Sequence, residues 1–170
     1  MSVTGLILAA AAAASASASS SASVSTEGVL TRHELSAVMA QKIATVAVAE
    51  CRRLGFRTTI SVVDASGMLK AFVRDDGTAP HTIDLSKAKA FTAVTLANRF
   101  ATTMEFATAR NSTLGSPASN IEGAVAIGGG VPIKYRGEVI GGVGSSGAVG
   151  GDKDELCSQA GIAAVADQLR

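Results

Sequence analysis

Histidine, a common metal ligand in proteins, is scarce in this chain. Its two histidines are His33 and His81, and a neutral imidazole can ligate a metal ion while a protonated one can hold an anion. For His33 the plainer interpretation is an exposed polar residue near the start of the first predicted helix. His81 closes a loop containing Gly77 and Pro80, so it could serve a ligand or simply begin the next helix. The sequence leaves both alternatives open.

Basic and hydroxyl side chains follow His81 along the second predicted helix and beyond it. Lys87, Lys89 and Arg99 could pair with carboxylates of a ligand, because charge-assisted hydrogen bonds are the strong kind. The alternative for the two lysines is a solvated helix face, on which they share one side. Thr102 and Thr103 could line a pocket or be ordinary helix residues. Met104 could supply a thioether ligand or fill a core position.

Glycine is concentrated in one stretch, with ten of the chain's 18 glycines between Gly128 and Gly151. Glycine permits positive φ and lets another backbone or a flat ligand approach closely. The stretch predicts a turn, two short strands and a second glycine-rich turn that opens a last helix at Asp152. Such a turn before a helix can offer unpaired N–H groups to an anion.

Several function classes are disfavoured. The net charge of +1 and an aromatic content of 4% give neither the basic surface nor the stacking platforms of a nucleic-acid-binding protein. The glycine-rich stretch matches neither a phosphate-binding loop nor a dinucleotide fingerprint, and Ser145 and Ser146 do not sit in a hydrolase nucleophile elbow. Cys51 and Cys157 could be buried thiols or, in an oxidising compartment, a disulfide.

The first 28 residues are compositionally distinct, with a short apolar run followed by a stretch of only Ala and Ser up to Ser23. This order is typical of a secretory signal peptide, which predicts export to a periplasmic or extracellular compartment. The alternative is a disordered Ala/Ser tail on a cytoplasmic protein, since no Lys or Arg precedes Arg32. The apolar run is too short to predict a transmembrane segment. The remaining residues, 29–170, are expected to form one domain.

Periodicity along this domain predicts an α+β fold with a single antiparallel β-sheet and helices packed against it. A capping box at Thr31 and Glu34 predicts the start of the first helix, near Arg32. The other elements are a hairpin of strands at 58–63 and 68–74, helices at 83–98 and 100–110, a loop at 111–120 and the glycine-rich strands. The last helix, over 153–169, is expected to turn Leu156, Ala160, Ala163, Ala164 and Ala166 inward.

Seven short motifs follow one another along this domain and together carry a resemblance to a known family. They include Val-Val-Asp-Ala-Ser-Gly ending at Gly67 and Gly-Gly-Gly-Val-Pro-Ile beginning at Gly128. As a set, they resemble the GlcG/HbpS-like haem-binding proteins from about residue 30 to residue 169. The motifs lie at residues 53–55, 61–67, 74–78, 86–93, 128–133, 141–147 and 152–155. The chain departs from the family at 97–103, where many relatives have Gly-Arg-Pro-Thr and this sequence lacks the proline.

The resemblance implies a profilin-like α/β sandwich that binds haem, or another tetrapyrrole or corrinoid. It implies homo-oligomers built from dimers, up to octamers, and a sensor protein as a partner. The function expected is an accessory one in haem sequestration, traffic or sensing; the alternatives are a small-molecule catabolic enzyme using the same pocket and a structural oligomer that binds nothing. The expected cofactor contacts are His81, Lys87, Lys89, Arg99, Thr102, Thr103 and Gly144, with His33 or His81 as iron ligand.

Assembly follows from the same composition. A domain rich in Gly, Ala and Val has little bulky side-chain volume with which to close a haem-sized pocket alone. A slot between protomers would hold a large flat ring more readily. We therefore expect the region from His81 to Thr103 and the glycine strands to lie near an interface between protomers.

Overall fold

The computed structural model describes residues 28–112 and 121–170. Arg32–Arg170 form a compact unit separate from Met1–Thr31. The predicted signal peptide or tail therefore lies outside the described residues, apart from Gly28, and so does most of the predicted loop 111–120. The elements are α1 (Ala37–Arg53), β1 (Thr59–Asp64), β2 (Leu69–Arg74), α2 (His81–Thr95), α3 (Thr103–Ser112), β3 (Gly130–Tyr135), β4 (Glu138–Ser146), α4 (Gly151–Ala163) and the short 3-10 helix η2 (Ala166–Gln168).

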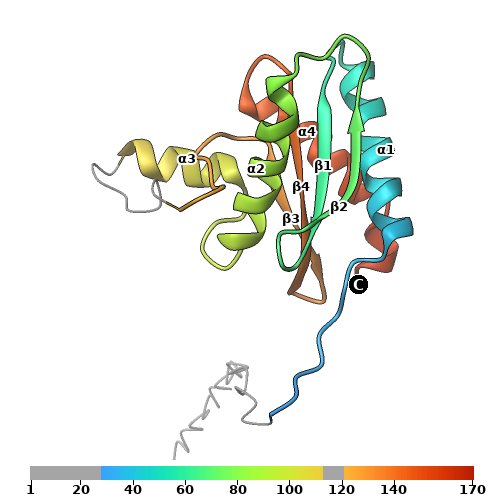
Figure 1. The fold of residues 1–170 in the computed structure, drawn as a ribbon, viewed down its shortest axis with the longest axis vertical. Coiled ribbons are helices and arrows are strands. Elements are labelled where there is room, and N and C mark those ends of the chain that lie inside the picture. Colours follow the sequence, from blue (N-terminus) through green and yellow to red (C-terminus); the bar gives the residue numbers. More distant parts are fainter. Residues whose placement is uncertain (1–27, 113–120) are drawn as a thin grey trace, which may run out of the picture. The chain divides into compact units, whose positions relative to one another are not determined.

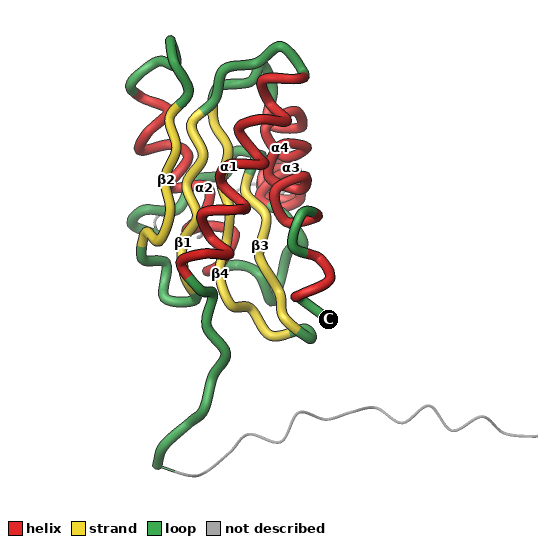
Figure 2. The backbone as a smooth tube through the Cα atoms, turned by 90° about the vertical axis from the view of Figure 1, so that its right-hand side faces the viewer, coloured by secondary structure: helices red, strands yellow, loops and turns green. Residues whose placement is uncertain are grey.

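The four strands form one antiparallel sheet in the order β2-β1-β4-β3, which confirms the predicted α+β class (Figure 2). The β1–β2 hairpin closes through Asp64, whose Oδ1 accepts hydrogen bonds from the N–H groups of Ser66 at 2.8 Å and Met68 at 3.1 Å. Gly67 supplies the positive φ of +80° that this turn requires. The hairpin tip is therefore fixed by its own backbone.

One face of the sheet is covered by α1 and α4 (Figure 1). Hydrophobic side chains fill the space between these helices and the sheet. Ile43 of α1 packs in the same buried cluster as Ile60, Val62 and Val143 of the two central strands. A disulfide ties the two helices together. This layer is the hydrophobic core of the domain.

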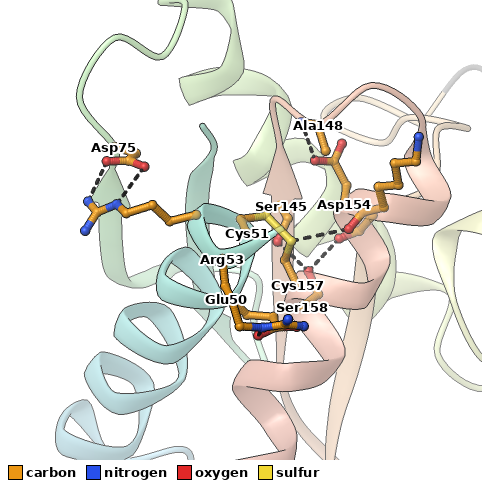
Figure 3. The surroundings of a disulfide bond; sticks show 12 residues. Glu50, Cys51, Arg53, Asp75, Ser145, Ala148, Asp154, Cys157 and Ser158 are labelled. Atoms are coloured by element: carbon orange, nitrogen blue, oxygen red, sulfur yellow. Dashed lines mark hydrogen bonds and ion pairs between the residues drawn. A yellow bond between two sulfur atoms is a disulfide. The ribbon is translucent and has the colours of Figure 1, made fainter. Parts of the chain in front are cut away.

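That disulfide joins Cys51 of α1 to Cys157 of α4, with 5.3 Å between their Cα atoms. Figure 3 shows the bond between the two helices, with Asp154 and Ser158 of α4 beside it. The separation lies within the range that a disulfide needs. Of the two alternatives that the sequence left open, the structure therefore shows the disulfide.

The other face of the sheet is covered by α2 (Figure 1). The helix approaches the sheet at glycines rather than at large side chains. A Cβ on Gly142 would lie 2.7 Å from the Ala90 carbonyl, and one on Gly144 would lie 2.5 Å from the Ala90 nitrogen. Buried hydroxyls complete the contact, with Thr59 Oγ1 bonded to Thr82 Oγ1 at 2.7 Å and Ser61 bonded to Ser86 at 2.8 Å. The glycine strands thus serve a backbone-to-backbone contact.

The first helix begins later than predicted. Ser36, rather than Thr31, is the N-cap, and its Oγ accepts a hydrogen bond from Met39 N at 3.1 Å. Glu34 is paired instead with Arg32. The expected capping box is therefore wrong, and His33 precedes the helix instead of lying in its first turn.

The last helix also differs from its prediction. It spans Gly151–Ala163, and its buried residues are Asp154, Cys157, Ser158 and Gly161. Leu156 is 53% exposed, and Ala163 is exposed as well. The expected inward set was therefore wrong for Leu156 and Ala163, while Ala160, Ala164 and Ala166 are half-buried. The fully buried residues of the helix are polar or small, so large apolar residues do not mark its inner side. No helix among the described residues is long and apolar enough to cross a membrane.

Candidate functional site

An apolar groove lies between the β1–β2 hairpin tip, the outer side of α2 and the loop at 122–123. Its volume is about 560 Å³. Of the predicted cofactor contacts, Lys87 is the one that lines it. The lining residues are Gly67, Met68, Leu69, Asp84, Lys87, Ala88, Phe91, Glu122 and Gly123.

Phe91 forms part of the groove between two glycines. A Cβ on Gly67 would lie 2.5 Å from Phe91 Cδ2, and a Cβ on Gly123 would lie 3.6 Å from Phe91 Cδ1. Both glycines have positive φ, +80° and +79°. Because neither glycine carries a side chain that would cover the Phe91 ring, the ring lines the groove and could contact a flat ligand.

The rim of the groove carries charge and a soft donor. Lys87 is exposed, and the carboxylates of Asp84 and Glu122 line the groove beside it. Met68 at the hairpin tip is 66% exposed, and its thioether is a side-chain type that ligates haem iron. Neither predicted iron ligand lines this groove.

Lys89 lies elsewhere, inside the protein. It is 1% exposed, and its Nζ donates to Asp154 Oδ2 at 2.7 Å and to the Ser145 carbonyl at 2.9 Å. Burial raises the pKa of Asp154 above its usual range, and the Lys89 ammonium opposes that shift. The solvated helix face expected for both lysines is found for Lys87 only. The ammonium group of Lys89, which we expected to pair with ligand carboxylates, pairs with Asp154 instead.

The other expected contacts on and after α2 have structural partners. Gly144 lies beneath the backbone of α2. Thr102 Oγ1 accepts a hydrogen bond from Glu105 N at 3.2 Å, and buried Thr103 Oγ1 accepts one from Gly130 N at 2.7 Å. Arg99 is exposed, with its guanidinium carbon 5.9 Å from the centre of the Phe100 ring.

His33 belongs to a separate small pocket of about 210 Å³ near the C-terminal end of the chain. Its Nδ1 lies 2.6 Å from Glu138 Oε2, and its ring lies 4.7 Å from that of Tyr135. Hydrogen bonds from His33 hold the pKa of Glu138 below its usual range. A carboxylate on one ring nitrogen is also how metal-binding histidines are oriented, but the described residues contain no group of three His, Cys, Asp or Glu side chains able to hold a metal ion.

His81 is the first residue of α2 and lines a third pocket, of about 390 Å³, with Arg57 and Thr78. The structure therefore does not bring the expected cofactor contacts together. Sequence reasoning missed the hairpin tip, Met68 and Leu69, and the position of Phe91 in the groove. Two large apolar residues directly after a turn glycine were the available signal, because exposed apolar clusters mark binding sites.

Solved structures of other proteins share this fold. A structure of HbpS is 30% identical to this chain with a TM-score of 0.75, covering 84% of this chain and 99% of that one. A double mutant of HbpS from Streptomyces reticuli is 33% identical with a TM-score of 0.73, covering 86% and 98%. The PduOC:heme complex is 29% identical with a TM-score of 0.66, covering 78% and 95%. No curated protein matches significantly.

The family model described as haem degrading protein, HbpS-like, matches residues 35–163. That span includes the strands and α-helices of the part of the chain that the structure describes, and every residue of the apolar groove. The chain therefore belongs to the HbpS-like family.

Proposed function

We propose that this protein binds haem in the apolar groove beside Phe91. The observation that carries the proposal is the Phe91 ring, held between two glycines and lining a groove of about 560 Å³. Membership of the HbpS-like family supports it, and so does the similarity to a protein crystallised as a haem complex. Sequestration, traffic or sensing of haem are the accessory roles that such binding would serve.

The side chains of the groove fit the parts of a haem. Phe91, Leu69 and Ala88 supply apolar surface for the flat ring, and Lys87 supplies the cation for a propionate carboxylate. Met68 would hold the iron through its thioether sulfur. Bound there, the haem would supply an iron centre that binds small ligands or transfers electrons.

Exposed apolar side chains beside the groove support assembly into homo-oligomers as part of the proposal. Leu69 and Met68 line the groove, while Phe72, Ile83 and Ile121 are exposed on the neighbouring β2, α2 and loop. A second protomer placed over this surface would bury them and close the groove over the ring. Light scattering at micromolar concentration tests this, because a monomer with undiminished haem affinity would contradict the shared slot.

Haem titration followed by absorbance tests the binding site. The purified chain should show a Soret band that saturates at a fixed ratio. Ala88→Phe, which fills the groove, should lower the affinity by about tenfold or more, since the ring loses its apolar contact. Ala49→Phe on the exposed side of α1 is the matched control and should bind haem as the parent does.

No spectral change on addition of haem, or equal haem binding by both variants, would contradict the site. Turnover of a small hydroxy acid without haem binding would favour the catabolic alternative.

We also propose that the chain is exported, with residues 1–28 as a signal peptide. The disulfide between Cys51 and Cys157 supports this, because such bonds persist in oxidising compartments. N-terminal sequencing of native protein should begin between about Ser15 and Gly28. Intact Met1 recovered from a non-cytoplasmic fraction would contradict cleavage.

A further inference from the structure

The pocket at the start of α2 shares no lining residue with the apolar groove. It lies where three connections meet, after α1, before α2 and after β4, and its volume is about 390 Å³. Its lining residues are Gly55, Phe56, Arg57, Gly77, Thr78, Ala79, His81, Thr82, Gly147 and Val149. No carboxylate is among them.

Arg57 is the permanently charged side chain among the lining residues of this pocket, and the carboxylates of Asp75 and Asp76 directly precede its lining residue Gly77. Arg57 is exposed, and its Nη1 donates to the Asp76 carbonyl at 2.9 Å, which leaves other guanidinium N–H groups without a partner among the described residues. Lys153 lies 5.6 Å from the centre of the ring of Phe56, which lines the pocket. The nearby carboxylate of Asp75 is buried and taken up by Arg52 through two hydrogen bonds.

The start of α2 adds a helix end without a side-chain cap and a buried hydroxyl without a partner among the described residues, while the N–H groups of Thr82 and Ile83 already donate to the Ala79 and Pro80 carbonyls. Pro80 is the N-cap and offers no side-chain hydrogen bond to the first turn, so the positive end of the helix dipole has no side-chain cap. Thr78 lines the pocket and is 3% exposed, yet its Oγ1 has no hydrogen-bond partner among the described residues. The buried hydroxyl of Thr58, next to Arg57, also has no hydrogen-bond partner among the described residues. Buried polar groups are normally paired, so an unpaired hydroxyl here indicates a missing partner.

These groups are chiefly hydrogen-bond donors of positive or neutral charge: a guanidinium, an imidazole, a hydroxyl and the start of a helix. A ligand that suits them is an acceptor with negative charge on oxygen. We infer that this pocket binds a small oxyanion, a phosphate or a carboxylate group, with Arg57 and Thr78 as its side-chain donors. Phe56 and Val149 line the same pocket and offer apolar surface for a small organic group attached to the anion.

Titration of the full, haem-free chain with inorganic phosphate tests oxyanion binding in this pocket. The titration is monitored by calorimetry and by the chemical shifts of backbone amides. Binding should shift the amides of Thr78, His81 and Thr82. Arg57→Gln should weaken phosphate binding about tenfold or more, and Thr78→Val, which keeps the side-chain shape, about threefold or more. Lys42→Gln on the exposed side of α1 removes the same charge and should leave the affinity unchanged.

Acetate in a parallel titration distinguishes the two sources of the anion. Tighter binding of acetate with the same dependence on Arg57 and Thr78 assigns a carboxylate ligand, and tighter binding of phosphate assigns a phosphate. The inference is overturned if neither anion shifts these amides, or if Lys42→Gln weakens binding as much as Arg57→Gln does. Haem binding at the apolar groove is measured separately by its absorbance, so either proposal can fail alone.

Discussion

The two faces of the sheet are held by different kinds of contact. Toward α1 and α4, branched side chains such as Ile43, Ile60 and Val62 fill the space. Toward α2, the helix backbone rests on Gly142 and Gly144, and the buried groups are largely polar. Side-chain packing can relax around a change in volume, whereas a backbone lying on glycine cannot. The α2 face should therefore be the less tolerant of the two, and it also carries the apolar groove on its outer side.

The largest expected effect comes from breaking the buried ion pair that joins Lys89 of α2 to Asp154 of α4. Lys89→Met should lower the free energy of unfolding by about 3–5 kcal/mol, because Asp154 is left buried without its cation. Urea unfolding followed by circular dichroism measures it.

The double variant Lys89→Met/Asp154→Asn is the control. It should be more stable than Lys89→Met alone, because the uncompensated charge is gone and the amide oxygen can still accept from Ala148 N. A Lys89→Met variant within about 1 kcal/mol of the parent would show that the pair does not hold α2 to α4.

The next effect comes from breaking the link within the opposite layer. Replacing both Cys51 and Cys157 by Ala should lower the free energy of unfolding by about 2–4 kcal/mol, since the disulfide closes a loop with a sequence separation of 106. Dithiothreitol should destabilise the parent by a similar amount and leave the double variant unchanged. An equal effect of the reductant on both proteins would contradict the disulfide.

A matched pair of one-methyl changes sharpens the comparison of the faces. Gly144→Ala adds a methyl group against Ala90 N and the Ser86 carbonyl, and should cost about 2–3 kcal/mol. Ile60→Val removes a methylene from the other face and should cost about 1 kcal/mol. Unfolding in urea ranks the two variants, and a larger cost for Ile60→Val would reverse the proposed order of tolerance.

The smallest effect concerns the ion pair that joins α1 to the loop leading into α2. Hydrogen bonds from Arg52, at 3.2 and 2.6 Å, hold the pKa of Asp75 below its usual range. A lowered pKa in the folded state stabilises the fold above the ordinary carboxylate pKa, and this stability is lost as the pH falls through the lowered value. Arg52→Gln should therefore reduce stability at neutral pH and flatten its decline below about pH 4. An unchanged acid profile would contradict the pairing.

Sequence periodicity predicted the sheet, the hairpin and the helices but not which polar groups the helices bury. Lys87 and Lys89 were placed on one side of their helix, although residues two apart point to nearly opposite sides. Lys89 could not be recognised as a core residue because its partner, Asp154, lies 65 positions away. Long-range pairing of this kind leaves no local pattern.

The candidate site was less predictable for a related reason. The glycine-rich stretch was interpreted as room for a backbone or a flat ligand, and the structure assigns Gly142 and Gly144 to the backbone of α2. The groove instead uses Gly67 and Gly123, which lie 56 positions apart and meet only at Phe91. The family resemblance indicated a ligand class, whereas the location of the groove depends on tertiary contacts.

The disulfide also determines how the protein responds to a protease. All four strands, α2 and α3 lie between Cys51 and Cys157, so the covalent loop encloses the whole sheet. A single cut anywhere inside that loop leaves both pieces attached to one another, at unchanged mass apart from the added water. Separate fragments should appear on a gel only after a reductant is added.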